Sequence, residues 1–147
     1  ITVLTQSFPE LHSLDLFDEQ MLLYCGKGHA LYECSEDQIQ PKHLLEYKFV
    51  ESPRLMPGRE MHPDMRNWNN HAKAHHQEAR ATLILSGHYL GMLPTHMVSN
   101  WGLGKQLKPI LTKRYGYTNT FSAIYRSSHP NQMIIEQFRR CLEQVKQ

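Results

Sequence analysis

The chain has 147 residues, of which 40% are hydrophobic and 20% are charged, and its formal net charge is +2 at pH 7. This length and composition are typical of about one globular domain with its own core, and they exclude an intrinsically disordered chain. The 16 basic residues nearly balance the 14 acidic ones and are scattered, so the chain has no clustered basic face of the kind that a stand-alone DNA-binding domain needs.

The sequence also argues against a membrane-spanning helix, a secretion signal and a disulfide framework. It has no run of about 18 apolar residues, so we expect no membrane-spanning helix, and it opens without the charged and apolar regions of a secretion signal. Cys25, Cys34 and Cys141 form no C-x-x-C pair, so we expect free thiols in a reducing cytoplasm. Because the chain opens on Ile1 without a methionine, we expect a fragment that begins inside a strand.

The first third of the chain predicts two strands with helical turns between them. Residues 21–25 form an apolar run closed by glycines, which is typical of a buried strand. Residues 35–45 predict short helical turns that start with a capping box at Ser35. Residues 47–51 predict the next strand, and Pro53 ends it.

The middle of the chain is irregular at first and then periodic. Residues 53–70 show little periodicity and predict a long surface loop with one helical turn near 65–68. Residues 71–75 alternate and predict a strand. Residues 77–86 have helical spacing, and Gly87 follows at the position where a left-handed residue ends a helix.

The last third predicts a strand over 89–93, then a helix from Pro94 through Trp101. Further strands are expected over 107–111 and 120–125. The chain closes with an amphipathic helix, capped by Asn131 or Ser128, whose apolar face comprises Ile134, Phe138, Cys141, Leu142 and Val145. Strands that alternate with helices predict an α/β fold with a largely parallel sheet.

Ten histidines raise the question of a metal site, most of all His71, His75 and His76 with His62 nearby. Zinc needs three or four ligands that the fold holds together, and no cysteine pair supports such a site. We therefore interpret these histidines as structural or surface residues and expect no bound metal and no cofactor.

Redox and catalytic roles are also weakly supported. Cys25 and Cys34 could form a redox switch, but Cys25 falls inside a predicted buried strand, where a thiol acts as a small hydrophobe. The sequence has no G-x-S-x-G, H-E-x-x-H, P-loop or G-x-G-x-x-G motif. We therefore expect that the chain is not an enzyme.

Several strings, taken in order, resemble the effector-binding domain of LysR-type transcriptional regulators. Residues 16–31 resemble that family's leucine, acidic residue, apolar strand and His-Pro-Leu, with Ala30 in place of the proline. Residues 78–94 resemble its Glu-Ala, apolar helix, small-Gly and Gly-apolar-Leu-Pro pattern, with one apolar residue fewer. Without the resemblance, this second string predicts only a helix–turn–strand–helix unit. Residues 124–127 and the closing helix resemble the family's return strand and last helix.

The resemblance implies a type II periplasmic-binding-protein-like fold, in which two α/β lobes are joined by crossover strands and bind an effector between them. It implies the end of lobe one and the outgoing crossover over residues 1–20, and a complete effector-binding lobe two over 21–111. Residues 112–147 would return and add the C-terminal strand and helix of lobe one. We expect this helix, without part of its packing surface, to repack on lobe two or on a partner chain.

The resemblance also implies a position for the effector. Ser52, Pro53 and Arg54 follow a strand end at which family members line the site, and Thr120 and Phe121 lie on the return crossover. Arg54 could pair with a carboxylate effector, or it could be a solvated loop arginine.

The sequence therefore predicts the effector-sensing domain of a bacterial LysR-type transcriptional regulator. We expect it to be cytoplasmic and homo-oligomeric, to bind a small molecule, and to reach DNA only through a separate helix-turn-helix domain. The alternative is a fragment of a periplasmic-type solute-binding protein, which shares the two-lobe fold. The free cysteines and the Ser-Gly and Leu-Pro strings favour the regulator.

Overall fold

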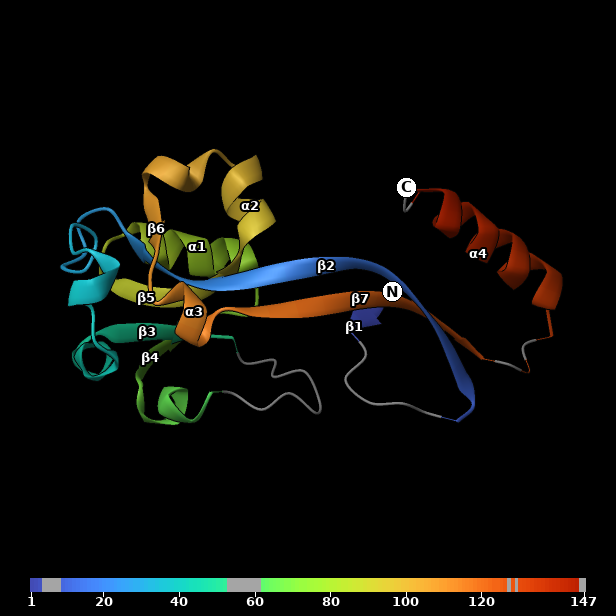
Figure 1. Cartoon of the computed structure of the whole chain (residues 1–147), viewed down its shortest axis with the longest axis horizontal. Coiled ribbons are helices and arrows are strands. Elements are labelled where there is room, and N and C mark those ends of the chain that lie inside the picture. The colour runs from blue at the N-terminus through green and yellow to red at the C-terminus, as the bar shows by residue number, and fades with distance from the viewer. Residues whose placement is uncertain (4–8, 53–61, 127, 129, 146–147) are drawn as a thin grey trace. The chain divides into compact units, whose positions relative to one another are not determined.

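The computed structural model describes residues 1–3, 9–52, 62–126, 128 and 130–145. The chain forms two compact units, which divide the described residues into 1–19 with 118–145 (unit 1) and 20–117 (unit 2). Strand β2, Leu11–Gly26, begins in unit 1 and ends in unit 2, and strand β7, Tyr117–Arg126, leads back (Figure 1). None of the helices in the described part of the chain is long and apolar enough to cross a membrane.

Unit 2 contains a mixed sheet. Strand β3 (Lys48–Glu51) runs parallel to β4 (Asn69–Lys73) and to β5 (Tyr89–Pro94). Strand β2 pairs antiparallel with β5 on one side and with β6 (Leu107–Pro109) on the other. The expectation of a largely parallel sheet is therefore wrong, because a strand that is buried on both faces has the same apolar pattern in either direction.

Both faces of this sheet are covered, which explains the continuous apolar run of β2. Met21, Leu23 and Cys25 face one core cluster, whereas Leu22 and Tyr24 face the other. This alternation follows from the two-residue period of a strand. Alternate residues of the run are therefore buried against different layers. Unit 2 consists of the sheet and one layer on each of its faces.

One layer consists of α1 (Gln77–Leu85) and α2 (Thr95–Asn100). The helix predicted over 77–86 is confirmed, and Gly87 follows it with a φ of 76°. The backbone there lies 3.0 Å from the position a Cβ would occupy, so a side chain would be both strained and crowded. The second predicted helix is also confirmed, although Pro94 is the last residue of β5 rather than the first of α2.

The other layer is built from short turns. The 3₁₀ turns η1 (Glu36–Gln38), η2 (Pro41–Glu46) and η3 (Pro63–Asn67) confirm the predicted helical turns. A third short helix, α3 (Thr112–Tyr115), was not expected from the sequence, and β6 ends two residues earlier than predicted. Turn η4 (Leu103–Lys105) completes the unit.

Unit 1 contains strand β1 (Thr2–Val3), the first half of β2 and helix α4 (Gln132–Val145). Strand β7 lies between β1, with which it pairs antiparallel, and β2. Helix α4 begins after Asn131, whose carbonyl oxygen accepts the first helical N–H groups, as one of the two predicted caps requires. The helix belongs to unit 1, and its expected repacking on lobe two or on a partner chain stays a prediction. Its predicted apolar face is partly exposed, since Ile134 and Phe138 are 66% and 58% accessible.

Candidate functional site

The parallel strands of unit 2 end at one common edge, which we call the carboxyl edge. Strand β3 ends before Ser52, β4 ends before Ala74, and β5 leads directly into Thr95 at the start of α2. Ligands of open α/β sheets bind at such an edge, because strand ends and helix starts bring backbone donors and short polar side chains together there. The carboxyl edge is therefore the candidate site of unit 2.

Ser52 is half-buried at this edge, and its neighbours are held by the sheet. The N–H of Ala74 donates to the carbonyl oxygen of Glu51 at 3.0 Å. The Glu51 carboxylate also lies 3.5 Å from the ammonium group of Lys73, although the Lys73 side chain is 67% exposed. The edge thus offers a hydroxyl group at Ser52 beside a fixed backbone and a charge pair.

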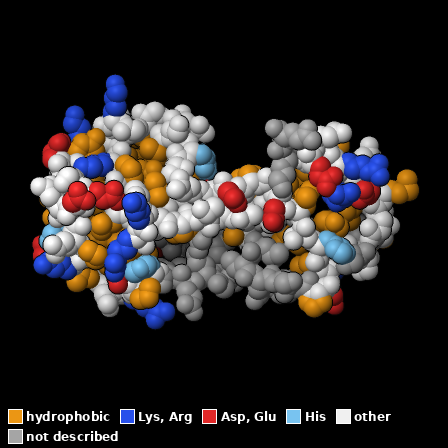
Figure 2. Space-filling model, viewed as in Figure 1, with side chains coloured by type: hydrophobic (Ala, Val, Ile, Leu, Met, Phe, Trp, Pro, Cys, Tyr) orange, Lys and Arg blue, Asp and Glu red, His pale blue; other side chains and the backbone are white. Residues whose placement is uncertain are grey.

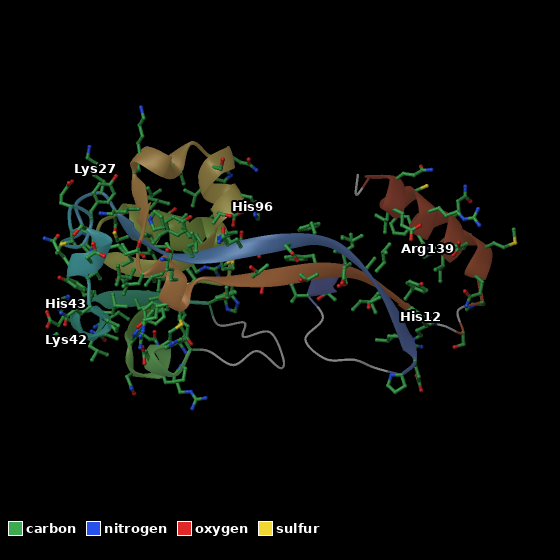
Figure 3. The ribbon with its side chains drawn as sticks, viewed as in Figure 1. His12, Lys27, Lys42, His43, His96 and Arg139 are labelled. Atoms are coloured by element: carbon green, nitrogen blue, oxygen red, sulfur yellow. The ribbon has the colours of Figure 1, made fainter. Side chains whose placement is uncertain are left out.

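Helix α2 starts at the same edge without a side-chain cap. Its exposed His96 lies beside that end of the unit, whereas Lys27, Lys42 and His43 lie at the opposite end (Figure 3). The two predicted site residues next to Ser52, Pro53 and Arg54, lie outside the described residues. Of the three predicted residues after β3, only Ser52 is placed at the carboxyl edge.

The other two predicted site residues lie in unit 1, on the pair of strands formed by β2 and β7. The hydroxyl group of Thr120 donates to Oδ1 of Asp18 at 2.7 Å. Phe121 stacks on Phe17, with ring centroids 5.0 Å apart and planes inclined by 15°. The Phe17 ring remains 55% exposed, so this stack presents an aromatic face at the surface of the strand pair.

Two further polar pairs occupy the same strands. Asn119 donates to Oε2 of Glu19 at 3.2 Å, and both side chains are buried. Ser122, also buried, donates to Oδ1 of Asp15 at 2.7 Å. Buried polar groups require such partners, because an unsatisfied one costs free energy. The strand pair is therefore joined by side-chain hydrogen bonds along much of its described length.

Sequence reasoning missed the acidic members of these pairs, Asp15, Asp18 and Glu19. The only local signal was three carboxylates within five positions of a stretch that also carries Leu14, Leu16 and Phe17. The partners lie 100 or more residues away, so no local pattern pairs them.

The candidate histidines and the Cys25 thiol have different surroundings in the structure. His71, His75 and His76 are exposed, and the described residues include no group of three or more side chains that could hold a metal ion. Cys25 is fully buried, and this burial raises the pKa of its thiol to about 11. Such a thiol is protonated at neutral pH and unreactive, as the buried strand predicts.

A separate cavity of about 570 Å³ lies within unit 1. Strands β2 and β7, helix α4 and Ile1 line it, mostly with apolar side chains such as Leu14, Ile124 and Phe138. Its polar members include Arg139, which pairs with Glu136 and Glu143 on its own helix.

In the face shown in Figure 2, acidic and basic side chains are mixed, so that face presents no large basic patch.

Known proteins resemble this chain in sequence and in fold. The family described as the LysR substrate binding domain matches residues 1–147. The chain is 32% identical over 128 residues to the HTH-type transcriptional activator BauR of Pseudomonas aeruginosa, covering 87% of this chain and 42% of BauR. The chain thus spans less than half the length of this curated relative.

Solved structures share the fold at low sequence identity. The regulatory domain of CrgA, a LysR-type regulator from Neisseria meningitidis, has a TM-score of 0.68 at 18% identity, over 99% of this chain and 74% of that one. The CcmR regulatory domain of Synechocystis PCC6803, solved in complex with 2-PG, has a TM-score of 0.69 at 15% identity, over 99% and 72%. These domains confirm the expected periplasmic-binding-protein-like α/β architecture.

Proposed function

The chain belongs to the LysR substrate-binding domain family, and from this membership we propose that it is the effector-sensing domain of a bacterial LysR-type transcriptional regulator. In this proposal unit 2 is the effector-binding lobe, and β2 and β7 are the crossover strands. A small molecule that binds between the lobes changes the balance of conformations that the DNA-binding domain senses.

The observation that carries this proposal is the carboxyl edge of unit 2, where Ser52 follows a central parallel strand. The proposed effector contacts are Ser52, Pro53 and Arg54 on one lobe and Thr120 and Phe121 on the crossover. The hydroxyl groups and the aromatic face suit a small ligand with both polar and apolar surface, and Arg54 suits a carboxylate.

The remaining features of the proposal follow from the family. We propose that the intact protein acts in the cytoplasm as a homo-oligomer and contacts DNA through a helix-turn-helix domain. It would act without catalysis and without a cofactor. The alternative of a periplasmic solute-binding protein loses support, since BauR and CrgA are both transcriptional regulators.

The proposal can be tested by screening the full-length regulator for thermal stabilisation with short aliphatic and aromatic carboxylates. A ligand found in this way is then titrated against Ser52→Ala and Arg54→Ala variants. Loss of a charge-assisted hydrogen bond costs about 1.5–3 kcal/mol, so we expect Arg54→Ala to weaken binding by about tenfold or more. Ser99→Ala removes an exposed hydroxyl group from α2 and is the matched control for Ser52→Ala.

Two results would contradict the proposal. One is a ligand whose affinity is the same for all three variants, which would place binding elsewhere. The other is a full-length protein whose DNA affinity does not change when the ligand saturates it.

A further inference from the structure

The chain leaves unit 2 through a strained corner at residues 110–116. Leu111 has a φ of 48° and a ψ of 43°, and it is the only non-glycine residue in the described part of the chain with a positive φ. This left-handed conformation is unfavourable for an ordinary L-residue, because the Cβ crowds the following carbonyl oxygen. Such strain persists only where the surroundings enforce it.

Buried neighbours fix both ends of the corner. The N–H of Ile110 donates to the carbonyl oxygen of Leu23 in β2 at 2.9 Å, and the Ile110 side chain is only 1% exposed. Gly116 lies so close to the sheet that a Cβ there would be 2.8 Å from Cδ2 of Leu22. The corner therefore starts and ends against the same strand.

Two carboxylates from different turns hold α3 between these ends. Oε1 of Glu36 accepts the N–H of Thr112 at 2.8 Å. Oδ2 of Asp64 accepts hydrogen bonds from Nε and Nη2 of Arg114 at 3.0 and 2.8 Å. The same oxygen accepts a hydrogen bond from the hydroxyl group of Tyr115 at 2.9 Å. These hydrogen bonds, those from Arg114 first, lower the pKa of Asp64, so it remains ionised.

Aromatic rings complete the contact between η3 and α3. The rings of Trp68 and Tyr115 are packed edge to face, with centroids 4.9 Å apart, and Trp68 packs in the same way on Phe49 of β3. His62 packs on Tyr115 at 5.0 Å. Phe49 of β3, Trp68 at the end of η3 and Tyr115 of α3 thus form a continuous series of contacts, and only Gly116 lies between its end and β7.

We propose that Asp64 closes a latch on residues 110–116, and that its release lets Leu111 leave the left-handed conformation and changes the path by which the chain enters β7. Under the proposed function, Phe49 of the strand that ends before Ser52 packs on Trp68, and Trp68 packs on Tyr115, so described contacts lead from that strand to the residues before β7. The latch is a property of unit 2 itself, and its test requires no effector.

The test is amide hydrogen exchange of the full-length regulator at Tyr115 and Gly116, whose N–H groups bond to Leu111 and Thr112. Asp64→Asn keeps the shape but loses the charge, so we expect exchange at both amides to rise about tenfold. Leu111→Asn and Leu111→Ala both remove the packing of the leucine on the core, but only asparagine tolerates the left-handed region. Exchange at the two amides should therefore be about threefold slower in Leu111→Asn than in Leu111→Ala.

The difference between Leu111→Asn and Leu111→Ala distinguishes a strained latch from a rigid corner. Exchange as fast in Leu111→Asn as in Leu111→Ala would overturn the proposal, because the left-handed conformation of Leu111 would then store no strain. An equal rise at the Leu93 amide of β5 in Asp64→Asn would also overturn it, since the effect would then be global. Glu51→Gln, which removes the ion pair between Glu51 of β3 and Lys73 of β4, is the control and should leave both corner amides unchanged.

Discussion

The hydroxyl group of Thr120 lies 2.7 Å from Oδ1 of Asp18, although the two residues are 102 positions apart in the sequence. This contact joins the strand that leaves unit 1 to the strand that returns to it. The proposed effector contact at Thr120 is therefore already engaged as a donor and can offer a ligand only its acceptor lone pairs. A ligand at this position must donate a hydrogen bond or displace Asp18.

Thr120→Val should destabilise the protein by about 0.5–1 kcal/mol, because the Asp18 carboxylate loses its donor at an exposed position. The measurement is urea denaturation of the variant beside wild type. Thr120→Ser keeps the hydroxyl group and should restore most of the loss. A loss in Thr120→Ser without a loss in Thr120→Val would show that the methyl group, and not the hydrogen bond, stabilises the strand pair.

Stability should fall in acid because of His29. The side chain is buried, and this burial, with a smaller effect of His88, lowers the pKa of His29 below its usual value near 6.5. The folded protein therefore binds a proton less readily than the unfolded chain, so this stability is full above pH ~6.5 and is lost as the pH falls towards the folded pKa.

His29→Asn tests this effect, since an amide oxygen can still accept the N–H of Leu31, which now donates to Nδ1 of His29 at 3.1 Å. Between about pH 7.5 and 5.5 the melting temperature of this variant should fall less than that of wild type. His71→Asn, at an exposed position of β4, is the control. An unchanged slope in His29→Asn would exclude His29 as the source.

Gly26→Ala should destabilise unit 2 strongly. A Cβ at Gly26 would lie 2.0 Å from the backbone oxygen of Ile84, and backbone cannot move aside as a side chain can. Overpacking of this kind costs about 1–3 kcal/mol and sometimes more. Gly104→Ala meets no atom within 4 Å and should change the unfolding free energy by less than about 0.5 kcal/mol. Similar unfolding free energies for the two variants would contradict the packing described for β2 and α1.

The three thiols should react with a thiol reagent in order of exposure. Cys141 is exposed and should be modified first, and half-buried Cys34 should follow. Cys25, whose raised pKa keeps it protonated, should react only as fast as the protein unfolds. Kinetics measured with single-cysteine variants check this order, and fast native modification of Cys25 would show that unit 2 opens locally.

Local patterns predicted those parts of the fold that local physics decides. Helix α1 follows from its apolar spacing and from Gly87, and the run over 21–25 predicted a buried strand because both of its faces are covered. Strand direction was predicted wrongly, because strands pair with distant segments and their local sequence pattern does not depend on the direction of the partner. The length of β2 was underestimated since its first half alternates with charged residues.

The contacts of the candidate site and of the corner at residues 110–116 were less accessible to prediction. Helix α3 is four residues long and is held by Glu36 and Asp64, which lie 76 and 50 residues before the groups that they bind. No propensity reveals a helix that exists through such contacts. The predicted contact at Ser52 lies at a strand end as expected, while its role in binding remains a prediction.

The aromatic contacts of Trp68 make this residue an intrinsic fluorescent probe of unit 2. Its indole ring is 5% exposed, packs on Tyr115, and has no hydrogen-bond partner for Nε1 within the described structure, whereas Trp101 is 49% exposed. The two tryptophans should therefore emit at different wavelengths, and iodide should quench Trp101 while it leaves Trp68 bright. Fluorescence from Trp68 can then report on the surroundings of α3 without any added label.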